Sequence, residues 1–192
     1  MSRPMSARSE DGMLLRRRPL IGLTGTNGSG KGEAAAWLRA RGYAYLSLSD
    51  VIREALRGDG LAESRDAMIA RGNALRRACG PDVLARRVLA KVQGPTVVDS
   101  IRNPAEVAVL RATGRFVLLA FDAPPAVRFE RVGRRGRDES AADLDAFLRK
   151  EAEERGTDPE AQQLDACIAL ADIRIANDGS IEDLHRRLEE AL

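Results

Sequence analysis

The segment Gly25-Thr26-Asn27-Gly28-Ser29-Gly30-Lys31 constrains the fold of this chain more than any other part of the sequence. It fits the pattern G-x-x-x-x-G-K and stands between a short apolar run and a segment with helical periodicity. Glycines allow the backbone torsions that turn successive N–H groups toward an anion, and the N-terminus of the following helix adds positive potential. The segment therefore predicts a loop, with Lys31 as a mobile charge, that holds the phosphates of a nucleoside triphosphate. A glycine-rich turn that only packs a strand against a helix is the alternative, and Lys31 disfavours it.

Strand and helix patterns alternate along the rest of the chain. Apolar runs predict strands over 20–24, 43–48, 96–98, 116–121 and 173–175. Periodicity predicts helices over 33–41, 50–56, 64–79, 82–91, 104–113, 124–134, 144–155 and 164–170, and a last helix capped by Ser180. Ser49 or Asp50 is expected to cap the helix that follows the second strand. Strands joined by helical crossovers imply an α/β fold, a three-layer α/β/α sandwich on a five-stranded parallel sheet. The pattern does not give the strand order.

The length and composition suit one α/β domain over residues 19–192, preceded by a polar leader over 1–18 that we expect to be disordered. The leader lacks the apolar stretch of a secretory signal, and no apolar run reaches the length of a membrane span. Cys79 and Cys167 form no metal-binding pattern, so we expect two buried thiols in the reducing cytoplasm. A net charge of +2, with one Trp, two Tyr and four Phe, disfavours a nucleic-acid partner. The sequence carries no signal for the oligomeric state.

Gly32 departs from the commonest form of the loop, in which Ser or Thr follows the Lys and ligates Mg²⁺. The run G-S-G-K-G resembles the phosphate loop of adenylate kinase and related nucleoside monophosphate kinases, in which Gly follows the Lys. In those proteins Thr usually comes next, whereas Glu33 stands here. The resemblance implies that ATP is bound by residues 25–32 and that the metal is held by phosphates and water. Asp99, at the end of the third strand, is our candidate to hold Mg²⁺ through water.

Two further segments resemble the acceptor side of such kinases. Leu46–Arg53 contains an Asp-x-x-Arg at a helix start, and Asp99–Pro104 follows the third strand with an Arg. The resemblance implies that Asp50, Arg53 and Arg102 contact an acceptor phosphate, with Arg102 also catalytic. Ligands of parallel sheets bind beyond the carboxyl ends of the strands, where Arg102 is expected. The alternatives are a surface salt bridge between Asp50 and Arg53, and an Arg102 that faces solvent.

The charged stretch Glu130–Asp138 resembles the short lid of a kinase. The resemblance implies that Arg131, Arg135 and Arg137 close over the transferring phosphates, within a lid over 131–142; a solvated surface loop is the alternative. Ala171–Ser180 resembles the last strand and loop of dephospho-CoA kinase, which lies against adenine. That resemblance implies a nucleotide contact for Asn177, although Asn-Asp-Gly-Ser is also sufficient for a turn without a ligand.

Taken together, the chain from Leu20 onward resembles archaeal and bacterial P-loop kinases of the nucleoside monophosphate kinase and dephospho-CoA kinase type. The resemblance implies strand order 2-3-1-4-5 and acceptor-binding helices over about 49–91. It also implies transfer of the γ-phosphoryl group of Mg-ATP to a small nucleotide-like acceptor, foremost a ribo- or deoxynucleoside monophosphate. A kinase for a hydroxyl group, as in dephospho-CoA, and a regulatory ATP-binding module with slow hydrolysis are the alternatives. No membrane partner is expected.

Overall fold

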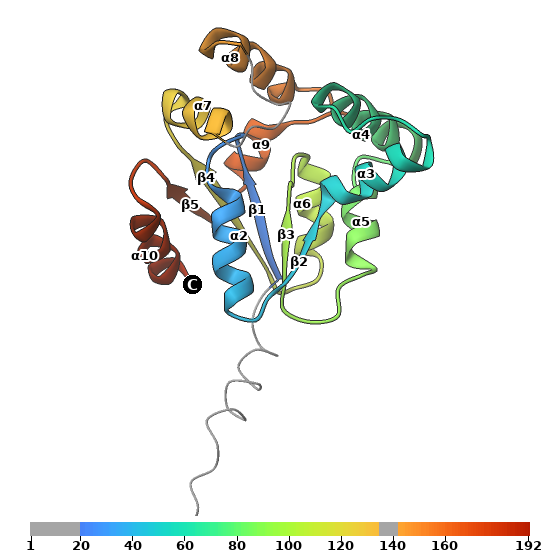
Figure 1. Ribbon diagram of the computed structural model, residues 1–192. Coiled ribbons are helices and arrows are strands. Elements are labelled where there is room, and N and C mark those ends of the chain that lie inside the picture. The colour runs from blue at the N-terminus through green and yellow to red at the C-terminus, as the bar shows by residue number, and fades with distance from the viewer. Residues whose placement is uncertain (1–19, 135–141) are drawn as a thin grey trace, which may run out of the picture.

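The computed structural model describes residues 20–134 and 142–192 (Figure 1). The leader expected over 1–18 and the lid residues Arg135 and Arg137 lie outside the described residues. Among the described helices, none is both long enough and apolar enough to cross a membrane.

Five parallel strands form one sheet in the order β2-β3-β1-β4-β5. They are β1 (Leu20–Gly25), β2 (Ala44–Ser47), β3 (Thr96–Asp99), β4 (Phe116–Asp122) and β5 (Ile173–Ala176). The central strand β1 is buried along its whole length, and its Gly22 is in register with Val98 of β3 and Leu118 of β4. The α/β sandwich and the strand order implied by the resemblance are both confirmed.

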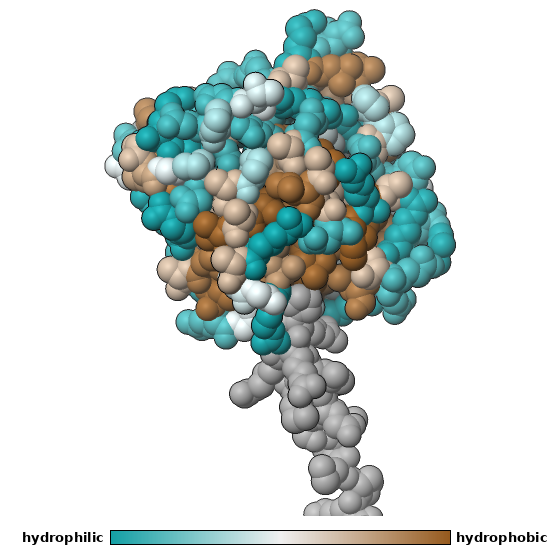
Figure 2. Space-filling view, turned by 180° about the vertical axis from the view of Figure 1, so that it is seen from behind, coloured by the Kyte–Doolittle hydropathy of each residue, from teal (hydrophilic) through white to brown (hydrophobic). Residues whose placement is uncertain are grey.

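Helices cover both faces of the sheet (Figure 1). On one face, α2 (Lys31–Ala40) and α10 (Ile181–Ala191) pack over a core that includes Ile21 and Leu23. On the other face, α5 (Val83–Leu89), α6 (Pro104–Arg111) and α9 (Leu164–Ala169) share a second core with Leu20 and Leu118. Alternate residues of one strand therefore enter opposite cores, as the period of a β-strand requires. Figure 2 shows the molecule from behind, where apolar side chains form a central group bordered by hydrophilic ones.

The remaining helices gather at the carboxyl end of the sheet, at the top of Figure 1. They are α3 (Leu48–Gly58), α4 (Arg65–Cys79), α7 (Pro125–Arg134) and α8 (Leu144–Ala152), and the 3₁₀ helix η1 (Glu153–Arg155) continues α8. Ligands of open parallel sheets bind at this edge. The fold therefore places α3, α4 and the α8–η1 segment around the candidate site.

Two local expectations were wrong. Ser47, not Ser49 or Asp50, caps α3, because its extended backbone lets the hydroxyl accept a hydrogen bond from the Ser49 N–H. Asp50 consequently lies in the first turn of α3. The two thiols are also not both buried: Cys167 is buried in the core, but Cys79 ends α4 and is exposed.

Candidate active site

The glycines of the phosphate loop are required by its backbone. Gly25, Gly28 and Gly30 have φ values of 131°, 77° and 104°, which L-residues rarely adopt. A Cβ atom at Gly28 would lie 2.6 Å from the carbonyl oxygen of Arg128, and one at Gly30 would lie 2.0 Å from Nδ2 of Asn177. The loop is thus pressed between α7 and the segment after β5, and only glycine fits these positions.

Several donors of this loop are available to an anion. No side chain caps the N-terminus of α2. The hydroxyls of Thr26 and Ser29 are buried without a hydrogen-bond partner among the described residues. Lys31 Nζ donates to the carbonyl oxygens of Gly25 and Thr26 at 2.7 and 2.8 Å, so it lies folded over the loop. Buried polar groups normally have partners. A helix N-terminus, two unpartnered hydroxyls and a lysine therefore fit the phosphates of a nucleotide.

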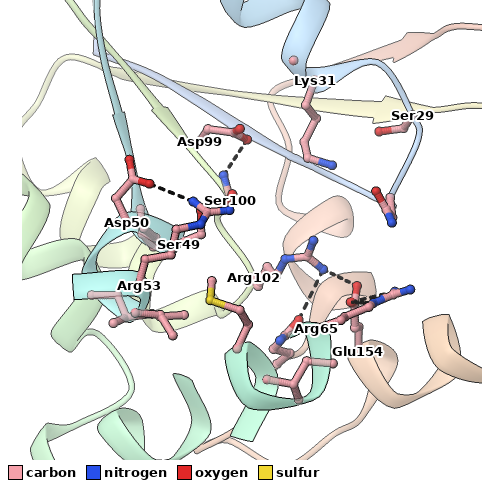
Figure 3. Close-up of a pocket in the computed structure, with 18 of the residues that line it drawn as sticks. Ser29, Lys31, Ser49, Asp50, Arg53, Arg65, Asp99, Ser100, Arg102 and Glu154 are labelled. Carbon is pink, nitrogen blue, oxygen red and sulfur yellow. Dashed lines mark hydrogen bonds and ion pairs between the residues drawn. The ribbon is translucent and has the colours of Figure 1, made fainter. Parts of the chain in front are cut away.

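A cavity of about 820 Å³ opens beside the loop. Residues 27–32 form one wall, and residues of α3, α4, the β3–α6 connection and η1 form the others (Figure 3). The cavity brings together five of the side chains expected from the sequence: Lys31, Asp50, Arg53, Asp99 and Arg102. Lys31 lies across the cavity from Arg102 in Figure 3, so the donor and acceptor residues face the same space.

Asp99 lies at the end of β3, where its carboxylate is held by two hydrogen bonds. Oδ2 accepts from the Tyr45 hydroxyl at 2.9 Å, and Oδ1 accepts from the Ser100 N–H at 2.6 Å. Burial and the neighbouring Asp99 charge raise the pKa of Tyr45, so the phenol stays protonated and donates. Ser100 is the non-glycine residue with positive φ, 66°, within the described part of the chain. Local strain of this kind is often found at functional sites.

The donor set suits a magnesium ion bound mainly by nucleotide and water. A Cβ atom at Gly32 would meet no atom of the described residues within 4 Å, so this position offers neither a hydroxyl nor an obstruction there. Residues 20–134 and 142–192 contain no group of three or more His, Cys, Asp or Glu side chains that could hold a metal alone. Mg²⁺ commonly keeps several waters and takes few protein ligands. A single, firmly held Asp99 fits that mode of binding.

Arg53 forms the salt bridge that the sequence offered as an alternative. Its Nη1 donates to Asp50 Oδ1 at 2.7 Å and to the Ser49 hydroxyl at 2.9 Å, and its Nε lies 3.5 Å from Glu63 Oε2. All four side chains line the cavity. The pair between Asp50 and Arg53 is therefore present, and it lies on the wall of the candidate site.

Arg102 contacts a buried carboxylate that the sequence did not reveal. Its Nη1 donates to Glu154 of η1 and to Gln162 Oε1. Arg65, at the start of α4, donates to the other oxygen of Glu154 through Nη2 at 2.9 Å. Burial would raise the pKa of Glu154, but the charges of Arg102 and Arg65 outweigh it and hold that pKa below its usual value. Glu154 is therefore ionised between two arginines.

The backbone of Arg102 is fixed by a second buried glutamate. Oε2 of Glu106 accepts from the N–H groups of Arg102 and Asn103 at 2.8 and 3.0 Å. Its Oε1 accepts from Nη2 of Arg76 at 2.7 Å. Glu106 and Arg76 are both buried, so their ion pair anchors the β3–α6 connection between α4 and α6.

Two expected residues lie away from the cavity. Arg131 donates to the carbonyl oxygens of Asn177 and Gly179, at 2.9 and 3.4 Å, on the loop that follows β5. Asn177 is buried and donates through Nδ2 to the carbonyl oxygen of Ser29 at 2.9 Å. Neither residue lines the cavity. Asn177 supports the phosphate loop from behind, and Arg131 fixes the loop that carries Asn177.

Two buried glutamates that the sequence did not reveal share one signal. Glu151 and Glu154 fall on the same helical face as Phe147, which is fully buried. Acidic residues on the apolar face of a predicted helix need buried partners, since isolated buried charges are costly. That pattern pointed to arginines elsewhere in the chain, but it could not say which ones.

Comparison with known proteins shows the family to which the chain belongs. A family model described as AAA domain matches residues 21–166. The chain belongs to this AAA domain family. This AAA-domain protein is 32% identical over 182 residues to a UPF0200 protein of Pyrococcus horikoshii, with 90% of this chain and 95% of the relative covered.

Two solved structures show the same fold. The AAA-domain chain matches protein TT1252 of Thermus thermophilus with a TM-score of 0.55 and 28% identity, over 91% of this chain and 96% of that one. It matches a shikimate kinase of Bacteroides thetaiotaomicron with a TM-score of 0.59 and 17% identity, over 90% and 97% of the two chains. The chain therefore has a P-loop NTPase fold with the strand order β2-β3-β1-β4-β5, which it shares with these two structures.

Proposed function

We propose that this protein is a kinase that transfers the γ-phosphoryl group of Mg-ATP to a nucleotide-like acceptor, foremost a ribo- or deoxynucleoside monophosphate. One observation carries the proposal. The phosphate loop and the acceptor-side residues Asp50, Arg53 and Arg102 line the same cavity, and Asp99 lines it too (Figure 3). A protein that only binds ATP has no need of a second set of phosphate-binding groups across the cavity.

Each side chain has a proposed part in the transfer. Lys31 and the N–H groups of the loop hold the phosphates of the donor, and Lys31 leaves its carbonyl partners to do so. Arg53 and Arg102 orient the acceptor, since guanidinium groups bind phosphate oxygens bidentately. Because the two guanidinium groups are already held in place by their carboxylate partners, they would lower the activation barrier of phosphoryl transfer by positioning the acceptor and by stabilising the developing negative charge.

Asp99 is proposed to hold Mg²⁺ through water. The bound ion supplies positive charge beside the transferring phosphate. Tyr45 and the Ser100 N–H hold the carboxylate of Asp99 in one orientation, because both donate to it.

Residues 131–142 are proposed to form a lid, whose Arg131, Arg135 and Arg137 would contact the phosphates of the donor. Arg131 contacts the loop after β5, beside Asn177. This position supports a part at the nucleotide end of the site, and Asn177 would act there through its contact with Ser29.

A hydroxyl acceptor is the second candidate, and the charges of the cavity favour considering it. Arg53 is paired with Asp50 and Glu63, and Arg102 with Glu154. These carboxylates reduce the positive charge that a phosphate acceptor would meet. Asp50 or Asp99 could accept the proton of an attacking hydroxyl, whereas a phosphate acceptor requires no strong base.

The test is ADP release from Mg-ATP with a panel of ribo- and deoxynucleoside monophosphates, dephospho-CoA and shikimate, a hydroxyl acceptor. Turnover stimulated by a nucleoside monophosphate supports the first candidate, and turnover with dephospho-CoA or shikimate supports the second. Tight ATP binding with no stimulation by any acceptor would refute both and favour a regulatory ATP-binding module. The Lys31→Ala protein serves as the control for contaminating kinases.

A further inference from the structure

The acceptor half of the cavity contains two arginines that share one buried carboxylate. Arg65 comes from the first turn of α4, and Arg102 comes from the β3–α6 connection. Their guanidinium groups approach Glu154 from two sides (Figure 3), Arg65 to Oε1 and Arg102 to Oε2. All three side chains line the cavity. Two positive charges and one negative charge leave this cluster with a net charge of +1.

We propose that Arg65 and Arg102 together form the site that binds the phosphate group of the acceptor, with Glu154 as the positioning residue that holds both guanidinium groups. The inference rests on the proposed function, which it deepens by adding Arg65 and Glu154 to the acceptor site. Nothing in the sequence motifs had marked either residue.

Both arginines retain donors for a ligand. Within the described residues, the side chain of Arg102 uses only Nη1 for its hydrogen bonds, to Glu154 and Gln162. Its other terminal nitrogen is turned toward the side of the cavity where Lys31 lies (Figure 3). Arg65 uses Nε and Nη2 on Glu154. Nη2 of Arg102 and Nη1 of Arg65 are therefore the donors that a phosphate would engage.

Glu154 is better placed to support these arginines than to compete with a ligand. Its side chain is 4% exposed, against 12% for Arg65 and 19% for Arg102. The carboxylate is thus the least exposed member of the cluster and lies between the two guanidinium groups (Figure 3). A carboxylate behind an arginine fixes the orientation of the planar group, and less rotamer entropy is then lost when a ligand binds.

The cluster also sits at the correct place for an acceptor. Lys31 and Asp99 both lie above the cluster in Figure 3, and all of these side chains line the same cavity. An anion held by Arg65 and Arg102 would point the rest of its molecule toward α3 and α4. There Leu48, Ile52, Met68 and Ile69 give an apolar wall. An acceptor with a phosphate at one end and an apolar or planar group at the other matches this arrangement.

The test measures the binding of inorganic phosphate to protein whose phosphate loop is saturated with the magnesium complex of a non-hydrolysable ATP analogue. We expect phosphate to bind the wild type. Arg65→Met and Arg102→Met should each weaken that binding by about tenfold or more, the loss of a charge-assisted hydrogen bond. Arg77→Met is the matched control, because Arg77 is exposed on the same helix and lies outside the cavity. The control should leave the dissociation constant unchanged.

Glu154→Gln tests the positioning role by kinetics. It should raise KM for the acceptor severalfold while kcat and the affinity for the ATP analogue change little. Loss of affinity for the analogue to the same degree would indicate general disruption of the fold and would refute a positioning role. Arg65→Lys should recover little of the phosphate binding, because lysine lacks the planar fork with which arginine binds Glu154 through Nε and Nη2 and keeps Nη1 for a phosphate.

Three results would overturn the proposal: no phosphate binding to nucleotide-saturated wild type, equal binding by Arg65→Met, or tighter binding of acetate than of phosphate. Failure of the proposed function is a separate result. Phosphate binding that depends on Arg65, without turnover of any acceptor, would support the phosphate site and refute the proposed kinase activity. Acceptor-stimulated turnover that does not change in Arg65→Met would support the kinase activity and refute the phosphate site.

Discussion

Two glycines that are two residues apart, Gly30 and Gly32, should respond to alanine in opposite ways. Gly30 has φ 104° and a Cβ there would meet Asn177 Nδ2 at 2.0 Å. Gly32 lies in the first turn of α2, and a Cβ there would meet nothing within 4 Å. The same substitution at the two positions therefore tests whether the backbone conformation of the loop, and not only its glycine content, is required.

The size of the effect follows from the contacts. At Gly30, an L-residue costs about 1–2 kcal/mol in backbone strain. The Asn177 side chain must also move and lose its hydrogen bond to the Ser29 carbonyl, at about 1 kcal/mol or more. Gly30→Ala should lower the free energy of unfolding by about 2–4 kcal/mol. Gly32→Ala should raise it by about 0.5–1 kcal/mol, because alanine is the better helix former.

Urea unfolding at equilibrium measures both values, and binding of a fluorescent ATP analogue reports on the loop. Gly30→Ala should lose most of its nucleotide affinity, while Gly32→Ala should keep it. A Gly30→Ala protein as stable as the wild type would refute the described loop backbone. A Gly32→Ala protein that is strongly destabilised would refute the open position assigned to Gly32.

Three further predictions concern single side chains. Lys31→Ala should lower the affinity for ATP by at least about tenfold, and loss of its hydrogen bonds to the carbonyls of the buried residues Gly25 and Thr26 should lower the free energy of unfolding by about 1–3 kcal/mol. Isothermal titration with ATP and a urea curve check this, and near-normal affinity would contradict the phosphate loop. Glu154→Gln should lower the free energy of unfolding by about 3 kcal/mol at pH 7, because it leaves two partly buried arginines without their carboxylate. The pKa of Glu154 is lowered in the folded protein, so the stability that its ionised form contributes is complete above the ordinary carboxyl pKa and is lost as the pH falls through the folded pKa. The free energies of unfolding of wild type and Glu154→Gln should therefore converge in acid. A difference that stays constant with pH would refute the ion pairs. Burial raises the pKa of Cys167 to about 12, whereas Cys79 is exposed. A thiol reagent at pH 8 should therefore label one cysteine in the native protein and two after unfolding. Rapid labelling of both cysteines in the native protein would contradict the burial of Cys167.

The fold could be predicted from the sequence because its strongest signals are local. The apolar run of β1, the glycines after it and the helical periodicity of α2 lie within about twenty residues, and each depends only on neighbours in the chain. Pro104 at the first turn of α6 and Ser180 before α10 marked their helices for the same reason. The order of the strands depended on the resemblance to kinases, since hydrophobic pattern alone does not choose between neighbours.

The candidate site was only partly predictable. Asp50, Arg53 and Arg102 belong to short motifs, so their presence at the cavity could be expected. Arg65 and Glu154 are 89 residues apart and meet only when α4 packs beside η1. The prediction of Ser49 or Asp50 as the cap of α3 failed for a local reason. Ser47, which was not considered, stands within three positions of both and is of an equally suitable residue type. Only the backbone angles of Ser47 decide between them.

The segment α8–η1 shows why such long-range pairs matter for the chemistry. Glu151 accepts from Nη1 of Arg128, a buried side chain that also donates to the carbonyl of Asn27 in the phosphate loop. Glu154, three residues further, holds Arg65 and Arg102 on the acceptor side. One turn of the chain therefore neutralises arginines on both halves of the cavity. A shift of this segment would displace the donor loop and the acceptor arginines together, because neither ion pair can be broken cheaply in a buried setting. The acceptor and donor sites are thus tied to a common element, and we expect a substitution at Glu151 to weaken nucleotide binding first and one at Glu154 to weaken acceptor binding first.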